Sequence, residues 1–79
     1  MIKNIMLSKH AKEKLVERKI SKQSVEDAVL HPDETLFGRE GIRIAHKKKN
    51  DKMLRVIFRE EEKYYIVVTA YLTMKERYR

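Results

Sequence analysis

The chain has 79 residues, which is enough for one domain with a small hydrophobic core but not for an enclosed cofactor cavity. Lys and Arg number 19 against 12 Asp and Glu, and this net charge of +7 favours polyanionic partners, nucleic acid first and acidic protein or lipid second. The absence of cysteine excludes disulfides and thiolate metal sites, and no apolar run approaches the ~20 residues of a membrane span, so we expect a cytoplasmic protein without membrane contacts.

The first predicted helix covers residues 9–19. Ser8 is a favourable N-cap for it, and the short apolar segment Met1–Leu7 is either an edge strand or the lead into this helix. Apolar residues at four-residue spacing define its buried face: Leu7, Ala11 and Leu15. A stripe with the same spacing borders that face: His10, Lys14 and Arg18. A purely structural helix keeps such residues away from its buried edge, so the stripe is a candidate functional surface.

A second helix is predicted over residues 22–30. Ser21 is its N-cap, and its inner face is apolar: Val25, Ala28 and Val29. The helix ends before Pro32, because the residue that precedes a proline avoids the helical conformation. Only one or two residues separate the two helices, so they form a tight angular pair.

Beyond Pro32 the apolar period changes from 3.6 to 2, which indicates strands. Four strands are predicted, followed by a basic tail at 73–79: 34–37, 42–48, 53–59 and 64–72. The last two form a hairpin joined by the charged segment Glu60–Lys63. A three-residue loop, Glu61–Lys63, keeps the apolar faces of the two strands aligned, which a two-residue loop would not. The predicted fold class is α+β, a single domain over residues 1–79 in which both helices pack on one face of a 3–4-stranded antiparallel sheet.

Alternation along the strands divides the predicted sheet into two faces. The face under the helices is expected to be apolar: Ile42, Ile44, Leu54, Val56, Phe58, Ile66, Val68 and Ala70, with His46 in the same phase as a structural residue. The opposite, open face is expected to mix cations with tyrosine and threonine: Arg43, Lys47, Arg55, Arg59, Tyr65, Thr69 and Tyr71. The three-residue loop pairs Arg55 with Thr69 and Arg59 with Tyr65.

An open sheet face of this composition suits single-stranded RNA, because guanidinium groups bind phosphate and tyrosine rings stack on unpaired bases. We expect no metal and no cofactor, since the acidic residues do not repeat at ligand spacing and His31–Glu34 reads as a helix stop and turn. RNA cleavage without a metal needs a proton acceptor, cations for the phosphorane and a proton donor. Residues of suitable type are His10, Arg18 or Arg55, and Tyr71 or Tyr78.

Several short motifs resemble one family, DUF4258, over roughly Leu7 to Tyr71. They are Ser8-Lys9-His10-Ala11, Glu17-Arg18-Lys19-Ile20-Ser21, the Val25–Leu30 helix, Leu54-Arg55-Val56 and Ile66-Val67-Val68-Thr69-Ala70-Tyr71. This family is related to RelE/ParE-like toxins and to the barnase, colicin and RelE group of ribonucleases. The ending Lys75-Glu76-Arg77-Tyr78 is also similar to the close of BrnT-type toxins.

The resemblance implies a RelE-like fold whose open sheet face binds and cuts RNA. The implied catalytic residues are His10, Arg18, Arg55, Thr69 and Tyr71. Around them we predict an RNA-binding set: Lys14, Arg43, Lys47, Arg59, Tyr65, Arg77 and Tyr78. His10 lies on a helix while Arg55 and Thr69 lie on the far sheet face, so the sequence does not show that they converge.

The favoured hypothesis is a RelE-like toxin, a metal-independent endoribonuclease acting on free RNA or ribosome-bound mRNA. A cognate antitoxin protein is expected to neutralise it by covering the basic face with acidic or helical elements. One alternative is a non-catalytic nucleic-acid-binding module that uses the face of Arg43, Arg55, Arg59 and Tyr65. Another is a protein-interaction domain whose charge is incidental. The sequence leaves open which residue acts as base or acid, the RNA sequence preference and the oligomeric state.

Overall fold

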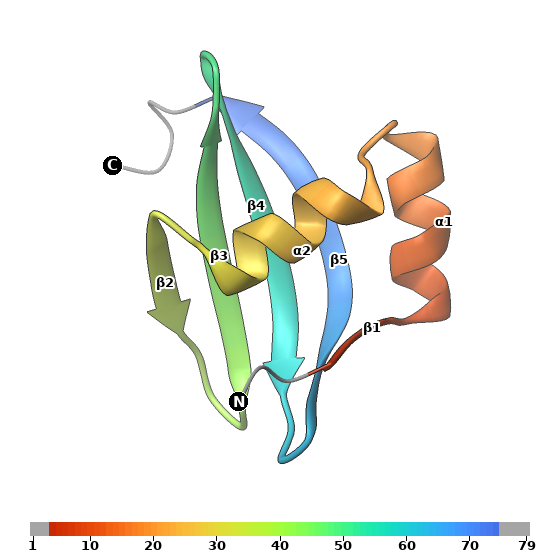
Figure 1. The fold of residues 1–79 in the computed structure, drawn as a ribbon, viewed down its shortest axis with the longest axis vertical. Coiled ribbons are helices and arrows are strands. Elements are labelled where there is room, and N and C mark those ends of the chain that lie inside the picture. The colour runs from red at the N-terminus through yellow and green to blue at the C-terminus, as the bar shows by residue number, and fades with distance from the viewer. Residues whose placement is uncertain (1–3, 75–79) are drawn as a thin grey trace.

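The computed structural model describes residues 4–74 and has the predicted α+β class, with two helices and one sheet. The elements in chain order are β1 (Asn4–Leu7), α1 (Lys9–Glu17), α2 (Lys22–Leu30), β2 (Glu34–Phe37), β3 (Ile42–Lys49), β4 (Lys52–Glu60) and β5 (Tyr64–Met74). The sheet has five strands in the order β1-β5-β4-β3-β2 (Figure 1). The prediction of three or four antiparallel strands is therefore wrong in number and in kind, because β1 pairs with β5 in parallel and makes the sheet mixed.

The additional strand, β1, arises from the apolar segment before the first helix. Its side chains alternate, and Ile5 and Leu7 pack against the core from the helix side. Just beyond the strand, the backbone N–H of Ser8 donates to the Val67 carbonyl at 3.0 Å. Backbone groups in a partly buried segment need partners, and pairing with β5 supplies them. Strand pairing therefore shows that residues 4–7 form an edge strand, one of the two alternatives that the sequence left open, and residues 1–3 lie outside the described part of the chain.

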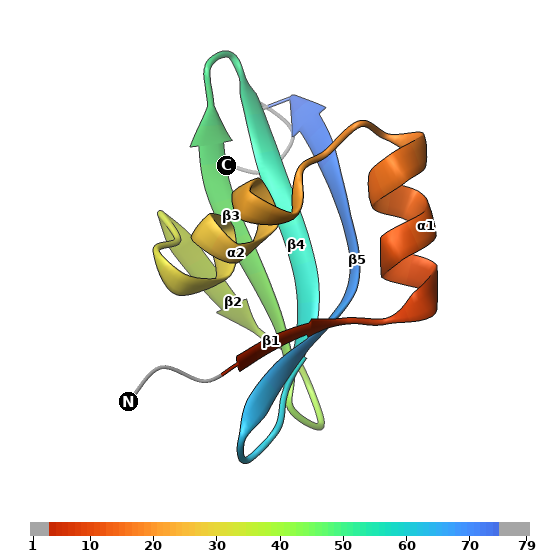
Figure 2. The same cartoon turned by 45° about the vertical axis from the view of Figure 1, so that its right-hand side comes forward.

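Both helices lie in one layer over the sheet. α2 crosses β3 and β4 diagonally, and α1 stands along β5, as the two views in Figure 1 and Figure 2 show. Both predicted N-caps are confirmed: Ser8 Oγ accepts from the Ala11 N–H at 3.0 Å, and Ser21 Oγ from the Ser24 N–H at 3.1 Å. Among residues 4–74, no helix is long and apolar enough to cross a membrane.

The first helix ends two residues before its predicted limit of 19. Lys19 adopts a left-handed conformation, with φ of 56°, just after the cap residue Arg18. The N–H of Ile20 then donates to the Leu15 carbonyl at 2.9 Å, a bond that closes the last turn of α1 in a Schellman motif. This ending turns the chain toward α2 and fixes the position of Arg18 at the C-terminal end of α1.

The core lies between the helices and the sheet. α1 contributes Ala11 and Leu15, and α2 contributes Val25, Ala28 and Val29, as the helical spacing predicts. The sheet contributes Ala45, Leu54, Val56, Phe58, Val67 and Ala70. At about 1.5–3 kcal/mol for each fully buried aliphatic or aromatic side chain, this burial is the main force that holds the helices on the sheet.

The predicted phase of β3 is wrong. Asn50 and Asp51 form a two-residue turn that pairs Lys49 with Lys52, so Lys47 lies opposite Leu54 in the ladder. Directly opposed residues share a face. Four residues of β3 therefore lie on the helix side, namely Arg43, Ala45, Lys47 and Lys49, while the open face receives Ile42, Ile44, His46 and Lys48.

The predicted register of the β4–β5 hairpin is also wrong. Arg55 pairs with Tyr71 rather than Thr69, and Arg59 pairs with Ile66 rather than Tyr65. The Glu61 N–H bonds the Tyr64 carbonyl at 2.9 Å, which tightens the loop and shifts the ladder by one residue. A β-bulge then shifts the ladder a second time. Val67 pairs with Phe58 and Thr69 pairs with Ile57, so no residue of β4 lies opposite Val68.

The bulge explains which apolar residues of β5 are buried. Before it, Tyr65 and Val67 point to the helix side; after it, Ala70 does so. Val68 is instead 37% exposed, and Ile66 lies on the open face opposite Arg59. A regular strand cannot place both Val67 and Ala70 on one face, since side chains alternate. The bulge resolves this conflict.

Candidate active site

Four polar side chains form a continuous line across the open face of the sheet. They occupy directly opposed positions on neighbouring strands: Glu34 on β2, His46 on β3, Arg55 on β4 and Tyr71 on β5. We call these four residues the cross-strand row. Antiparallel neighbours at opposed positions have Cβ atoms about 5 Å apart, so each member lies within side-chain reach of the next.

Arg18 joins the row at its β5 end. Arg18 is the C-cap residue of α1, and its side chain reaches β5. Its Nη1 donates to the Ala70 carbonyl at 2.9 Å and to Thr69 Oγ1 at 3.3 Å. Its guanidinium carbon lies 5.8 Å from the centroid of the Tyr71 ring. The hydrogen bond to a strand carbonyl fixes the direction of a long and otherwise mobile side chain.

Tyr71 lies near two cations. The guanidinium carbon of Arg55 is 6.0 Å from the Tyr71 ring centroid, comparable with the Arg18 distance. Both separations fall within the range of cation–π attraction. Two permanent positive charges and one phenol hydroxyl therefore occupy the same part of the open face, where they suit the binding of a phosphodiester.

His46 and Glu34 form a contact at the opposite end of the row. His46 Nδ1 lies 3.2 Å from Glu34 Oε1, and the imidazole is only 2% exposed, whereas the Glu34 side chain is 58% exposed. The backbone is tied at the same place, because the Asp33 N–H donates to the His46 carbonyl at 2.8 Å. β2 thus carries a carboxylate to a buried histidine.

Four of the five predicted catalytic residues converge. Arg18 contacts Thr69 and lies beside Tyr71, and Arg55 lies beside the same ring. His10 does not join them in the described part of the chain: it is exposed in the first turn of α1, eight residues before Arg18. At 1.5 Å of rise per residue, this separation is about 12 Å along the helix.

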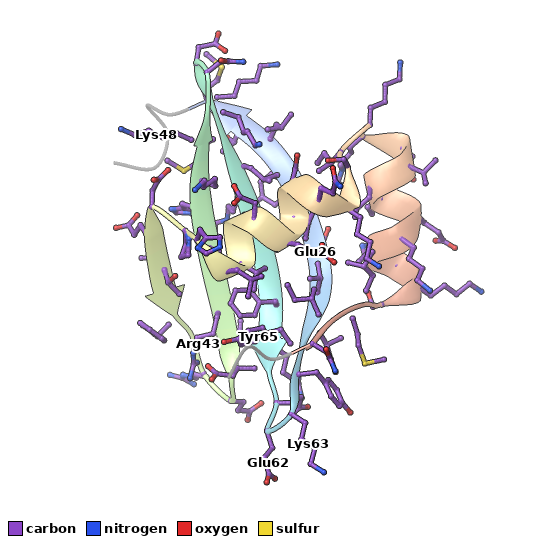
Figure 3. All side chains as sticks on the ribbon, in the orientation of Figure 1. Glu26, Arg43, Lys48, Glu62, Lys63 and Tyr65 are labelled. Carbon is purple, nitrogen blue, oxygen red and sulfur yellow. The ribbon has the colours of Figure 1, made fainter. Side chains whose placement is uncertain are left out.

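The predicted RNA-binding residues divide between the two faces. Arg59 is exposed on the open face, and Lys14 is half-buried on α1, where its Nζ lies 3.5 Å from Glu17. Lys48, a further exposed cation on the open face, was not predicted (Figure 3). Arg77 and Tyr78 lie outside the described residues.

The prediction that Arg43, Lys47 and Tyr65 lie on the open face is wrong. The phase of β3 turns Arg43 and Lys47 to the helix side, and the register of the β4–β5 hairpin turns Tyr65 there. Lys47 Nζ donates to the His31 carbonyl at 2.6 Å and lies 3.5 Å from Asp27 Oδ2. Arg43 Nε lies 3.4 Å from Glu60, and the Tyr65 ring packs edge-to-face on Phe58 at 5.2 Å. Figure 3 shows Arg43 and Tyr65 together below α2. Their contacts are structural ones that tie the sheet to α2 and to the neighbouring strands.

Sequence reasoning missed His46 and Glu34. The signal for His46 was the Asn50-Asp51 turn, since a two-residue loop sets Lys47 against Leu54 and turns His46 to the open face. The pattern Ile42-x-Ile44-x-His46 instead looked like a buried stripe and fixed the wrong phase. Glu34 had no comparable signal, because its role depends on which β3 residue lies opposite the short strand β2.

The comparisons with known proteins agree with the motifs found in the sequence. A family model described as "Domain of unknown function (DUF4258)" matches residues 7–72. No curated protein and no solved structure matches the chain. The matched segment contains both helices, Arg18 and every member of the cross-strand row. Because this match covers most of its length, the chain belongs to the DUF4258 family.

Proposed function

We propose that this protein is a metal-independent endoribonuclease of the RelE-like toxin type, with its active centre on the open face around Tyr71. The observation that carries the proposal is that two arginines, one at the end of α1 and one on β4, have their guanidinium carbons 5.8 Å and 6.0 Å from the centroid of the Tyr71 ring. Arg18 and Arg55 come from distant parts of the sequence, so the fold itself brings them together.

The chemistry follows from these groups. The 2′-hydroxyl of RNA attacks the adjacent phosphorus, and negative charge builds on the non-bridging oxygens in the transition state. Arginines hold two such oxygens through paired N–H donors, and their charge is permanent at physiological pH. Stabilising this charge is usually the largest single contribution to catalysis, and it requires donors that are already in place. Arg18 meets that requirement because Ala70 and Thr69 hold it.

The alternative of a non-catalytic nucleic-acid-binding module relied on a face shared by four residues. Two of them, Arg43 and Tyr65, are on the helix side, so that surface loses half of its members. Arg55, which remains on the open face, lies beside Tyr71 together with Arg18 from α1. This arrangement favours a reaction centre over an extended binding surface.

We also propose a protein partner, a cognate antitoxin, for the open face. Besides the cross-strand row, this face carries the exposed apolar side chains of Met6, at 52%, and Leu36, at 40%. Half-buried isoleucines lie between them: Ile42, Ile44, Ile57 and Ile66. A partner segment with acidic groups for the arginines and an apolar stripe for the isoleucines complements both parts.

The direct test uses three end-labelled oligonucleotides of one mixed sequence, made of RNA, 2′-O-methyl RNA and DNA. The expected result is cleavage of RNA alone, leaving 2′,3′-cyclic phosphate and 5′-hydroxyl ends, since the reaction needs a free 2′-hydroxyl. A parallel reaction on mRNA in a translating extract covers ribosome-bound substrate. Intact RNA in both reactions contradicts the proposal.

A further inference from the structure

A pocket of about 250 Å³ opens on the helix side of the sheet, where the linker between α1 and α2 lies toward the same end of the molecule as the β3–β4 turn (Figure 2). Three aliphatic side chains form its apolar wall: Ile20, Leu54 and Leu72. Ile20 and Leu54 are buried, whereas Leu72 is 42% exposed although it lies opposite Leu54 on the core side of β5. A core-side leucine is normally covered, so its exposed part marks a gap in the helix layer.

Lysines surround the mouth of this pocket. Lys19 and Lys49 line it, Lys22 begins α2, and Lys52 lies directly opposite Lys49 in the β3–β4 ladder. Within residues 4–74, none of these four lysines forms an ion pair, and neither does Asp51 in the turn. Like charges at directly opposed positions of two strands repel each other. The mouth of the pocket therefore carries an excess of positive charge that the described part of the chain does not neutralise.

The backbone of Lys19 is in a conformation that lysine rarely adopts. Its φ of 56° lies in the left-handed region, where glycine is the usual residue just after a helix. Glycine would relieve this strain but would remove the ammonium group from the pocket, and strain of this kind gathers at functional sites. The other polar lining groups are engaged, because Ser21 Oγ donates to Ser24 Oγ at 2.9 Å and caps α2. The lysines are thus the groups that remain for a ligand.

The size of the pocket indicates the kind of ligand. Sites that enclose a whole small molecule or cofactor occupy about 300–1,000 Å³, and this pocket is smaller. It has room for one aliphatic side chain that projects from a peptide. In peptide and protein recognition, such an anchor fills an apolar pocket while polar groups at the rim surround it. Carboxylates next to the anchor would complement the lysines at this rim.

We propose that this pocket binds an acidic segment of a protein partner, which inserts one leucine-like side chain against Leu54 and Leu72. Carboxylates that flank the anchor contact Lys19 and Lys49. The pocket lies on the helix side of the sheet, whereas the proposed reaction centre lies on the open face. The inference therefore goes beyond the proposed ribonuclease function and does not rest on it.

Fluorescence anisotropy of three labelled peptides with the full chain tests the proposal. The first peptide is Gly-Ser-Glu-Glu-Leu-Glu-Glu-Ser-Gly, the second has glutamine for every glutamate, and the third has serine for the leucine. We expect saturable binding of the first peptide and about tenfold weaker binding of the other two, because charge and anchor both contribute. Equal affinity for the first two peptides would refute the charge complementarity. Absence of binding by the first peptide would refute the proposal as a whole.

Variants of the chain assign the binding to this pocket. Lys49→Glu should weaken binding of the acidic peptide about tenfold. Lys63→Glu makes the same charge change in the β4–β5 loop at the other end of the sheet and should retain wild-type affinity (Figure 3). Leu72→Gln should also weaken binding about tenfold, whereas Val16→Gln, an exposed aliphatic position on α1, should not. Equal losses in Lys49→Glu and Lys63→Glu, both folded by their melting curves, overturn the assignment.

Proton–nitrogen NMR of the wild-type chain locates the peptide without any substitution. Amide signals of residues 19–24, Lys49 and Leu72 should shift on addition of the acidic peptide, and those of Ile42 and Ile66 on the open face should not. Shifts confined to the open face contradict the proposal. A short oligouridylate tests nucleic acid as the rival occupant: if it shifts the pocket signals and the acidic peptide does not, the inference fails.

The two proposals fail separately. A chain that cuts RNA but does not bind the acidic peptide loses this inference and keeps the ribonuclease proposal. A chain that binds the peptide in the pocket but cuts no RNA, free or ribosome-bound, keeps this inference and loses the ribonuclease proposal.

Discussion

Arg18 donates a 2.9 Å hydrogen bond to the carbonyl of Ala70, so the end of the first helix is tied to the last strand at the residue next to Tyr71. The same guanidinium reaches Thr69 Oγ1 and lies 5.8 Å from the Tyr71 ring. One side chain therefore joins the helix layer to the open face of the sheet. The proposed reaction centre depends on this junction as much as on the sheet.

Replacing Arg18 should impair cleavage more than folding. Arg18→Ala removes one of two cations near Tyr71, and we expect at least a tenfold loss of RNA cleavage with a small fall in melting temperature, because the side chain is exposed. Arg18→Lys should recover little activity, since an ammonium group cannot make the paired contacts of a guanidinium. Lys22→Ala, an equal charge change at the exposed start of α2, is the control. Equal losses in Arg18→Ala and Lys22→Ala contradict this prediction.

The two faces of the sheet should differ in RNA binding. Arg59→Ala, on the open face, should weaken binding of single-stranded RNA and reduce the slope of log affinity against log salt by about 0.7, the contribution of one phosphate contact. Arg43→Ala removes the same charge from the helix side, where Arg43 contacts Glu60 and Phe37, and should leave the slope unchanged. Filter binding over a range of salt concentrations measures both variants. The reverse order of effects would refute the corrected phase of β3.

Ser8 should contribute to stability through its cap. Its hydroxyl accepts from the Ala11 N–H at 3.0 Å at the start of α1. Ser8→Ala should therefore lower the free energy of unfolding by about 1 kcal/mol, while Ser8→Asn should keep most of it, because asparagine caps equally well. Urea denaturation followed by circular dichroism measures both variants. Equal losses in the two would show that the cap does not stabilise the helix.

Leu54 should be among the most sensitive core positions. It is 1% exposed on β4 under α2, and Leu54→Ala should cost about 2–5 kcal/mol through lost burial and a residual cavity. Leu36→Ala makes the same chemical change on the edge strand β2, where the side chain is 40% exposed, and should cost well under half as much. Thermal and urea unfolding of both variants test the position of the core. Similar costs would contradict it.

The helices were predictable because their information is local. Cap residues, four-residue apolar spacing and Pro32 fix where each helix begins, what it buries and where α2 ends. The end of α1 was less predictable, because it depends on a left-handed lysine rather than the usual glycine. Parallel pairing of β1 was not predictable either, because it requires a contact with a strand at the other end of the sequence.

The main error of the sequence prediction was the assignment of residues to the two faces of the sheet, and the reason is physical. A shift of one residue moves every side chain of a strand to the other face. The Asn50-Asp51 turn reverses the predicted phase of β3, and the bulge at Val68 divides β5 into two phases. Arg55, Thr69 and Tyr71 kept the predicted face, because β4 is regular and both β5 residues follow the bulge. Sequence alternation alone therefore found the centre of the site but not His46.

The most direct test of the central claim is cleavage of a labelled single-stranded RNA in EDTA by wild-type protein, Arg55→Ala and Arg39→Ala. Arg39 lies in the exposed β2–β3 turn and provides an equal charge change away from the cross-strand row. We predict chelator-resistant cutting by the wild type and Arg39→Ala, and at least a hundredfold loss in Arg55→Ala, since removal of one transition-state donor costs about that much. Cutting that EDTA abolishes, or that Arg55→Ala retains in full, would contradict a metal-independent centre at Tyr71.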